Sequence, residues 1–168
     1  AVYHDLGNIN LTFIETAPRL PEFVTYLQRT LDFLNSIGLM AKGGERLGIY
    51  LNGLKISGSA QCVHKNRVLY HCTLLYDTDL TALHKALNPE LMVDDETLSS
   101  VYAVPSVRSE VTNIRSYLPE GTVTDFKEKA FQYFSKSQSV SAFTGKEIEA
   151  VNQLREGKYI QKEWIYSR

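Results

Sequence analysis

The chain is short of cysteine, of long apolar runs and of net charge. Its 168 residues include 2 cysteines, and 18 basic side chains nearly balance 19 acidic ones, which leaves a net charge of -1. A near-neutral chain gives no electrostatic argument for binding nucleic acid or an anionic membrane. No apolar run approaches the roughly 20 residues of a membrane-spanning helix. We therefore expect neither nucleic acid nor a membrane among its partners.

The common cofactor and metal motifs are missing as well. The sequence has no Walker-type or dinucleotide-binding glycine pattern, and no CxxC or HxxxH pair at the spacing of a zinc site, so no metal-binding residue is assigned. Cys62 and Cys72 lie in neighbouring predicted strands, where a disulfide is feasible. Two reduced thiols in a cytoplasmic chain are nevertheless the favoured interpretation.

The apolar pattern predicts an α+β fold. Strands are expected over residues 9–15, 47–51, 54–62 and 67–76, and helices over residues 21–38, 77–87, 122–136 and 144–157. Asn52-Gly53 is a two-residue hairpin signal, Gly38 a C-terminal cap, and Thr144 to Glu147 a capping box. Strands that precede helices favour a mixed, largely antiparallel sheet flanked by helices. The chain starts without methionine in a strand-like run and stops within apparently structured sequence, so we expect a fragment of a longer domain.

The most informative segment is Leu54 to Gln61, which reads LKISGSAQ. Lys55 lies in an apolar, strand-forming run, where a cation without a partner is costly to bury. Ser57 and Ser59 follow it and flank Gly58, which allows a ligand to approach the backbone closely. A cation surrounded by hydroxyl and amide donors is suited to holding a carboxylate or a phosphate. A solvated lysine on an edge strand is the simpler alternative for Lys55 taken alone.

Further candidates each have an ordinary structural explanation when taken singly. His4 and Asp5 precede a strand, and Asp5 would serve as a turn cap. His71 lies within a strand two residues before Thr73 and would be a core histidine, Cys72 would be a small buried hydrophobe, and Arg108 would be a solvated charge. No Ser-His-Asp arrangement is assigned from the sequence.

The order of these segments resembles the lipoate-protein ligase A family, within the wider biotin and lipoate ligase group whose catalytic domain is class II synthetase-like. The matching segments cover residues 1 to about 115 and read AVYHDLGNINLTF (1–13), NGLKISGSAQ (52–61), HCTLLYDTDLTAL (71–83), LNP (87–89) and SVRSEVTNI (106–114). The lysine-centred and SVRS motifs are specific to the family. The last fifty residues match it only loosely.

The resemblance implies a two-step reaction: lipoate, ATP and Mg²⁺ give lipoyl-adenylate, and the lipoyl group passes to a lysine of a carrier domain. The carriers it implies are the lipoyl domains of 2-oxoacid dehydrogenases and the glycine cleavage H protein. It makes Lys55 the catalytic contact to the lipoate carboxylate and the adenylate. It implies that the remaining binding residues are His4, Asp5, Ser57, Ser59, His71, Thr73 and Arg108. It also makes residues 89–105 a loop that covers the adenylate.

Three departures accompany the resemblance. The family's arginine- and glycine-rich motif would come just before Ala1, so residues 1–168 are interpreted as a partial catalytic domain. Glu45 to Gly48 read ERLG where the family has Gly-Arg-Asn-Asp, and Cys72 replaces a glycine. Because the Asn and Asp serve nucleotide and magnesium binding, two alternatives stay open. One is an octanoyl or lipoyl acyltransferase with a thioester on Cys72 or Cys62, and the other a non-catalytic lipoyl- or adenylate-binding protein.

Overall fold

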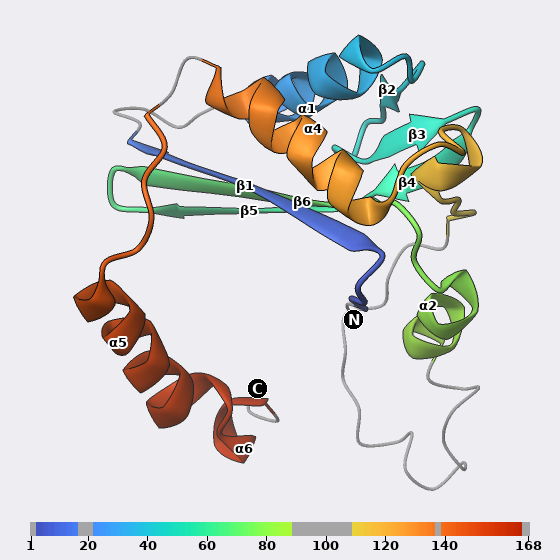
Figure 1. Ribbon diagram of the computed structural model, residues 1–168. Helices are drawn as coiled ribbons and strands as arrows, with labels where there is room; N and C mark the ends of the chain where they lie inside the picture. The colour runs from blue at the N-terminus through green and yellow to red at the C-terminus, as the bar shows by residue number, and fades with distance from the viewer. Residues whose placement is uncertain (1–2, 17–21, 89–108, 137–138, 166–168) are drawn as a thin grey trace, which may run out of the picture. The chain divides into compact units, whose positions relative to one another are not determined.

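The computed structural model describes residues 3–16, 22–88, 109–136 and 139–165. The chain divides into one unit that spans residues 1–133 and a second that spans residues 134–168. Each unit is described by itself. Two three-stranded antiparallel sheets carry the first unit (Figure 1).

The larger sheet has the strand order β1-β6-β5. It consists of β1 (Asn8–Thr16), β6 (Arg67–Leu75) and β5 (Ser59–His64). Side chains alternate along β6: Val68, Tyr70, Cys72 and Leu74 are buried on one face, whereas His71 and Thr73 lie on the other face and are only partly buried. The ladder therefore separates a core face from a more open, polar one.

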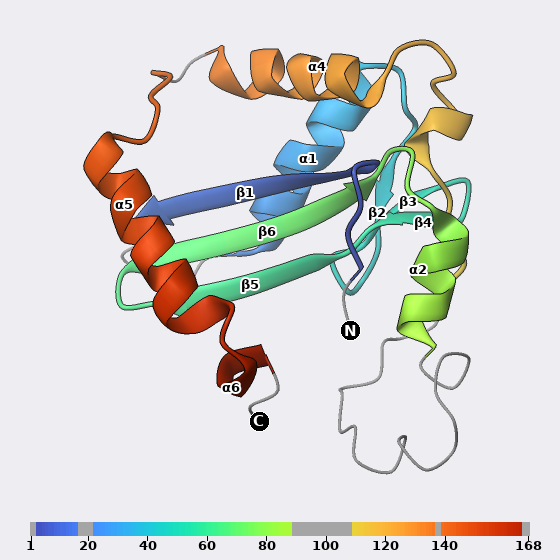
Figure 2. The ribbon, with the colours of Figure 1, turned by 60° about the horizontal axis from the view of Figure 1, so that its bottom comes forward.

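Two helices cover the core face, as Figures 1 and 2 show from two directions. They are α1 (Val24–Ser36) and α4 (Val123–Ser135). Tyr26 of α1 stacks on Tyr70 with 5.5 Å between ring centroids, and Phe33 meets Phe126 of α4 edge-on at 5.5 Å. Aromatic pairs of this kind add about 0.5–1.5 kcal/mol each to the burial of their surface. The expected helices over 21–38 and 122–136 are confirmed within the described residues, and Gly38 ends α1 at φ 91°.

The smaller sheet has the order β2-β3-β4. Its strands are β2 (Lys42–Gly43), β3 (Ile49–Leu51) and β4 (Leu54–Ser57). Asn52 and Gly53 have φ values of 49° and 84°, the double left-handed conformation of a type I′ hairpin, so the predicted turn is confirmed. The two-residue strand β2 was not predicted because it is too short to show alternation.

The expected strand over 54–62 is wrong in one respect, because it breaks at Gly58 into β4 and β5. These two strands belong to different sheets. At the break, the amide of Thr73 donates a 3.0 Å hydrogen bond to the carbonyl of Gly58. The chain therefore passes from the small sheet to the large one through a single glycine, and β6 holds it there.

Helix α2 (Leu80–Leu87) follows β6 and is capped by Asp79, whose carboxylate accepts from the amides of Thr81 and Ala82. The helix expected over 77–87 therefore begins three residues later than predicted. A short 3-10 turn, η2 (Ile114–Ser116), lies beside this start. The side-chain amide of Asn113 accepts a 3.0 Å hydrogen bond from the Thr78 N–H and donates a 2.8 Å hydrogen bond to the Thr78 carbonyl. It thus binds the Thr78 backbone as a neighbouring strand would.

The second unit is helical. It contains α5 (Gly145–Leu154), the π-helical turn η3 (Arg155–Tyr159) and α6 (Lys162–Ile165). The predicted capping box of Thr144 and Glu147 is confirmed. Gly157 does not end the helix as expected, because it lies inside the π turn. Across the described ranges no helix has the length and apolar character to span a membrane.

Gly7 is required by a close backbone contact. A methyl group added to it would lie 2.0 Å from the carbonyl oxygen of Asp77, and backbone atoms there cannot yield as a flexible side chain would. We expect Gly7→Ala to lower the free energy of unfolding by about 3 kcal/mol or to prevent folding, beyond the usual cost of overpacking. Urea unfolding followed by circular dichroism measures this. Gly145→Ala, which meets nothing within 4 Å, is the control and should change little.

Candidate active site

Lys55 lies on a strand that is held on both edges. In the β3–β4 hairpin it pairs with Tyr50. On its other side, its amide donates to the Glu110 carbonyl at 2.8 Å and its carbonyl accepts from the Thr112 amide at 3.0 Å. This makes a parallel bridge between Lys55 and Val111. Lys55 therefore projects from a fixed backbone and not from a free sheet edge, as the simpler alternative had supposed.

The Lys55 side chain is partly buried, and its ammonium has no ion-pair partner among the described residues. Its Cε lies 3.3 Å from the point that a methyl group on Gly48 would occupy, and the Tyr50 hydroxyl lies 3.3 Å from the same point. An ammonium that is partly withdrawn from water and lacks a carboxylate is suited to an anionic ligand.

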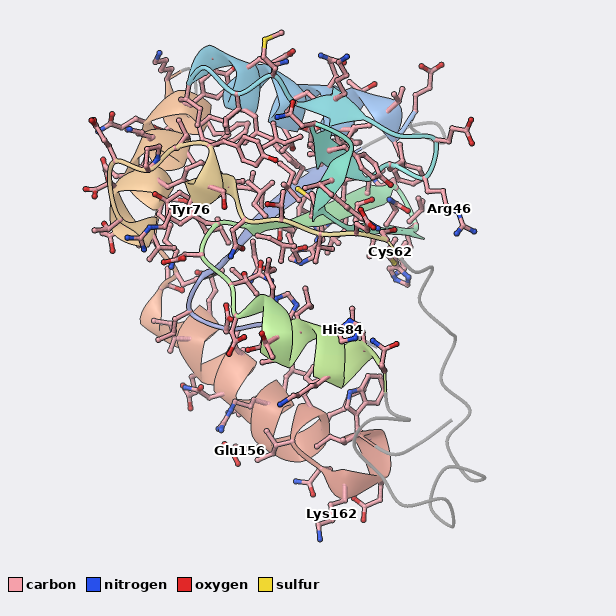
Figure 3. All side chains as sticks on the ribbon, turned by 90° about the vertical axis from the view of Figure 1, so that its right-hand side faces the viewer. Arg46, Cys62, Tyr76, His84, Glu156 and Lys162 are labelled. Carbon is pink, nitrogen blue, oxygen red and sulfur yellow. The ribbon has the colours of Figure 1, made fainter. Side chains whose placement is uncertain are left out.

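The turn between β2 and β3 forms the wall beside Lys55. The Leu47 amide donates to the Gly44 carbonyl at 3.0 Å, and the Gly44 amide donates to the Gly48 carbonyl at 2.9 Å. Leu47 has φ 57°, in the left-handed region that favours glycine or asparagine. Arg46 lies at the tip of this turn and points away from the fold (Figure 3).

The two serines have different environments. Ser57 is buried, and its hydroxyl donates to the Gly58 carbonyl at 3.4 Å. It also lies close enough to Cys72 to lower that thiol's pKa slightly against the larger effect of burial. Ser59 is partly buried and donates to the Leu47 carbonyl at 3.2 Å, which ties the β2–β3 turn to the sheet crossing. Both hydroxyls have partners inside the protein, and their predicted ligand contacts remain predictions.

A second group of candidates lies on the open face of the large sheet. Nδ1 of His71 lies 2.8 Å from the Thr12 hydroxyl on the neighbouring strand. Burial lowers the pKa of His71, and the charge of His4 lowers it further, which places His4 near this ring. Thr73 is two residues along the same strand and is the residue bonded to Gly58. The structure thus brings together His4, His71 and Thr73, with the Lys55 segment joined to them at Gly58.

Asp5 has a structural position in the described chain. Its carboxylate accepts from the Gly7 amide at 2.9 Å and from the Asp79 amide at 2.8 Å. The Tyr3 hydroxyl donates to it at 3.2 Å. One oxygen therefore caps the turn at Gly7, the alternative raised by the sequence, and the other joins this segment to the start of α2. Arg108 and the loop at 89–105 lie outside the described residues.

Two residues of this region were missed by the sequence analysis. Tyr50 borders Lys55, and Thr12 touches His71. Each faces its partner across a strand pair. Only the pairing register reveals such neighbours, although the alternation of residues in β1 does place Thr12 on the open face.

Cys72 is unsuited to the thioester chemistry considered above. It is fully buried, and burial raises the pKa of its thiol to about 11. Thr30 lies 3.8 Å from the sulfur. A thiol of this kind is neutral at physiological pH and shielded from substrate. Cys62, by contrast, is exposed. It lies on β5, a strand at the edge of the large sheet.

The residues described here do not fit a resident metal ion. No cluster of three or more His, Cys, Asp or Glu side chains in these ranges comes together as metal binding would require. Gly48 stands where the resemblance places an acidic residue and has no side chain to offer. The site is thus an arrangement of one cation, hydroxyls and a neutral imidazole.

Comparison with known proteins identifies the family of this chain. Residues 1–135 match the family model described as the lipoyl protein ligase A/B catalytic domain. A probable lipoate-protein ligase A of Mycoplasma pneumoniae is 37% identical over 141 residues, which cover 82% of this chain and 40% of the relative. Lipoate-protein ligase LplJ of Bacillus subtilis is 30% identical over 176 residues, which cover 100% of this chain and 52% of the relative. The chain therefore spans about half the length of the relatives it matches.

Solved structures agree on the fold. A bipartite lipoate protein ligase from Thermoplasma acidophilum, studied with its E2 lipoyl domain, superimposes with a TM-score of 0.73 at 24% identity, covering 97% of this chain and 65% of that one. A lipoate-protein ligase A bound with ATP gives a TM-score of 0.71 at 24% identity and covers 97% and 66% of the two chains. The fold is α+β, as predicted, and is that of a ligase catalytic domain. The chain belongs to the lipoyl protein ligase A/B catalytic domain family.

The two thiols should differ sharply in reactivity. We expect a maleimide at neutral pH to label Cys62 and to leave Cys72 unmodified, because Cys72 is buried and its pKa is raised to about 11. Mass spectrometry of peptides, with and without guanidinium, measures the difference. In a Cys62→Ser variant, native protein should take up no label. Rapid labelling of Cys72 in native protein would show that the core opens.

His71 should titrate below its ordinary pKa of 6.5, because burial and the charge of His4 both disfavour its protonated form. A histidine with a depressed folded pKa contributes stability above pH 6.5, and this contribution is lost as the pH falls through the folded value. Titration by NMR measures the folded pKa directly. His4→Asn should raise it part of the way back. His84→Asn on α2 is the matched control and should leave it unchanged.

Proposed function

We propose that this protein is a lipoate-protein ligase. It activates lipoate with ATP to lipoyl-adenylate and transfers the lipoyl group to a lysine of a carrier domain. Membership of the ligase A/B family supports this, as do the names of the relatives. A related structure contains ATP, and another contains lipoic acid.

The observation that carries the proposal is that Lys55 combines a fixed backbone with an ammonium group available to a ligand. Its backbone is hydrogen-bonded on both edges, and its ammonium has no carboxylate partner among the described residues. A cation fixed by the fold costs little to reorganise when charge develops beside it. Such a group suits a reaction that brings a carboxylate anion up to a phosphate.

The first step forms a bond between a lipoate carboxylate oxygen and the α-phosphorus of ATP. The bond from that phosphorus to the bridging oxygen of the β-phosphate breaks, and pyrophosphate leaves. Lys55 offsets the repulsion between the two anions and the charge of the transition state. In the second step the amine of a carrier lysine attacks the carbonyl carbon of the mixed anhydride. The new C–N bond makes the lipoyl amide, the amine loses a proton, and the bond from the carbonyl carbon to the phosphate oxygen breaks as AMP leaves.

The open face of the large sheet would bind the rest of the ligand. Its depressed pKa keeps His71 neutral at physiological pH, so it adds no charge to a site for an apolar acyl chain. Thr73 and His4 lie on the same side of the site, and Ser57 and Ser59 line the crossing beside it. Asp5 would support this face through its backbone contacts. Arg108 and the covering loop at 89–105 are proposed on the family resemblance alone.

Magnesium would arrive with ATP, held by the phosphates, since the described residues offer no metal cluster. No step is assigned to a metal bound by this chain. The thioester route through Cys72 finds no support in its burial.

The proposed carriers are lipoyl domains of 2-oxoacid dehydrogenases and the glycine cleavage H protein. A structure of a related ligase that was studied with its E2 lipoyl domain supports the first of these. A cytoplasmic location remains the prediction made from the two thiols.

Lys55→Ala should abolish detectable lipoyl-adenylate formation, since loss of a fixed donor to the transition state costs about 2.7–4 kcal/mol, or roughly 10²–10³ in rate. Incubation with lipoate, labelled ATP and Mg²⁺, followed by detection of the adenylate, measures this. Unfolding in urea should be nearly unchanged because the Lys55 ammonium has no ion-pair partner to lose within the described ranges.

Lys162→Ala in the second unit is the matched control and should retain full activity. Lys55→Arg keeps the positive charge but changes its geometry. Its rate of adenylate formation should lie between those of Lys55→Ala and Lys162→Ala. Activity of Lys55→Ala within a few-fold of the parent would contradict the proposal. Tight lipoate binding without turnover in the parent would instead support a binding protein, and acyl transfer to Cys62 a transferase.

A further inference from the structure

The space above Gly48 is shared by two side chains. A methyl group placed on Gly48 would lie 3.2 Å from Cε2 of Tyr50 and 3.3 Å from Cε of Lys55. Tyr50 and Lys55 are also directly paired across β3 and β4. Side chains opposite each other in an antiparallel pair lie on the same face and touch. The phenol ring and the end of the lysine therefore border the same space above a glycine that leaves room for both.

The Tyr50 ring is itself held in place. A methyl group on Gly44 would lie 2.6 Å from its Cε2 atom, closer than carbon atoms approach without something moving. Gly44 and Gly48 close the base of the β2–β3 turn through the 2.9 Å hydrogen bond between them. The ring thus lies against two glycines at the base of a hydrogen-bonded turn, and a side chain at position 44 would force it to move.

Packing in the core does not explain why a tyrosine stands at position 50. The ring is only partly buried, and its hydroxyl has no hydrogen-bond partner within the part of the chain that the structure describes. Buried tyrosines normally find such a partner. The position of the ring beside Lys55 is the feature that remains to be explained.

We propose that Tyr50 is a positioning residue for Lys55. Its ring packs along the lysine's alkyl chain and restricts the rotamers that carry the ammonium away from the site. A free lysine side chain has large rotamer entropy, so a restricted one is pre-organised for its anionic ligand. The inference rests on the proposed function, in which Lys55 meets the lipoate carboxylate. It adds a role for Tyr50 and for the space above Gly48.

Three variants test the ring and the space separately. Tyr50→Leu removes the ring, and the rate of adenylate formation should fall roughly 10–100-fold, the scale of a displaced catalytic group. Tyr50→Phe keeps the ring and should stay within about 3-fold of the parent, as packing requires. Gly48→Ala fills the shared space and should impair the rate as Tyr50→Leu does, because the lysine or the ring must shift.

Combining the variants gives a further check. Leucine lacks the tip of the phenol, so a methyl at position 48 has more room beside it. Tyr50→Leu with Gly48→Ala should therefore be no worse than either alone, which is the non-additivity of neighbours that act on one group. Tyr159→Leu and Gly145→Ala, both in the second unit, are matched controls and should leave the rate unchanged. Urea unfolding separates a loss of rate from a loss of structure.

A second readout does not depend on the reaction. Site-resolved acylation of lysines with an amine-reactive reagent, measured by mass spectrometry, reports how freely the Lys55 amine moves and is exposed. Labelling of Lys55 should rise several-fold in Tyr50→Leu and stay near the parent in Tyr50→Phe, with Lys42 and Lys162 unchanged. A parent that makes no adenylate but shows this labelling pattern would refute the proposed function and retain the positioning role. Parent-like labelling and rate in Tyr50→Leu, or a Tyr50→Phe variant as impaired as Tyr50→Leu, would overturn the positioning role.

Discussion

Two hydrogen bonds from residues outside either sheet, one on the amide and one on the carbonyl of Lys55, are the constraint on which the candidate site depends. They join Lys55 to Glu110 and Thr112 and occupy the edge of β4 that the hairpin leaves free. Without them, β4 would be the exposed edge of a small sheet. Unpaired backbone groups at such an edge can form hydrogen bonds with another chain. The cation is thus presented by a backbone that is fixed from both sides.

The same segment reaches further, to the start of α2. The Asn113 side chain is hydrogen-bonded to both the N–H and the carbonyl of Thr78. The backbone amide of Arg115 donates to the Tyr76 carbonyl at 2.9 Å. Residues 110–115 therefore connect the small sheet to the end of β6. Arg115 also forms an ion pair with Asp77, but both side chains are about half exposed, so the backbone contacts account for most of the connection.

Local chemistry allowed much of this fold to be predicted. Asn52-Gly53 specified its hairpin because two successive left-handed residues suit few other pairs, and Thr144 with Glu147 specified a helix start by satisfying free amides. The break at Gly58 could not be predicted, because alternation continues through it while the chain changes sheet. The same limit applies to part of the environment of Asp5. Its bond to the nearby Gly7 amide is the turn cap that the sequence suggests, whereas its bond to the Asp79 amide is a tertiary contact that the sequence does not reveal.

The departure from the family pattern at Glu45 to Gly48 has a structural counterpart. Leu47 takes a left-handed conformation that suits asparagine better than a γ-branched side chain. Gly48 leaves a space that the ends of Tyr50 and Lys55 now occupy. The left-handed position would suit the asparagine of the family pattern, while this chain places leucine there.

The single-residue crossing at Gly58 divides the candidate site between two sheets. Lys55 belongs to one, and His71 and Thr73 belong to the other. Under the proposed function, substitutions that reshape the open face of the large sheet would change which acyl chain is accepted, while the cation stays in its own hydrogen-bonded frame. Recognition of the chain and activation of its carboxylate would then belong to different sheets and could diverge independently during evolution.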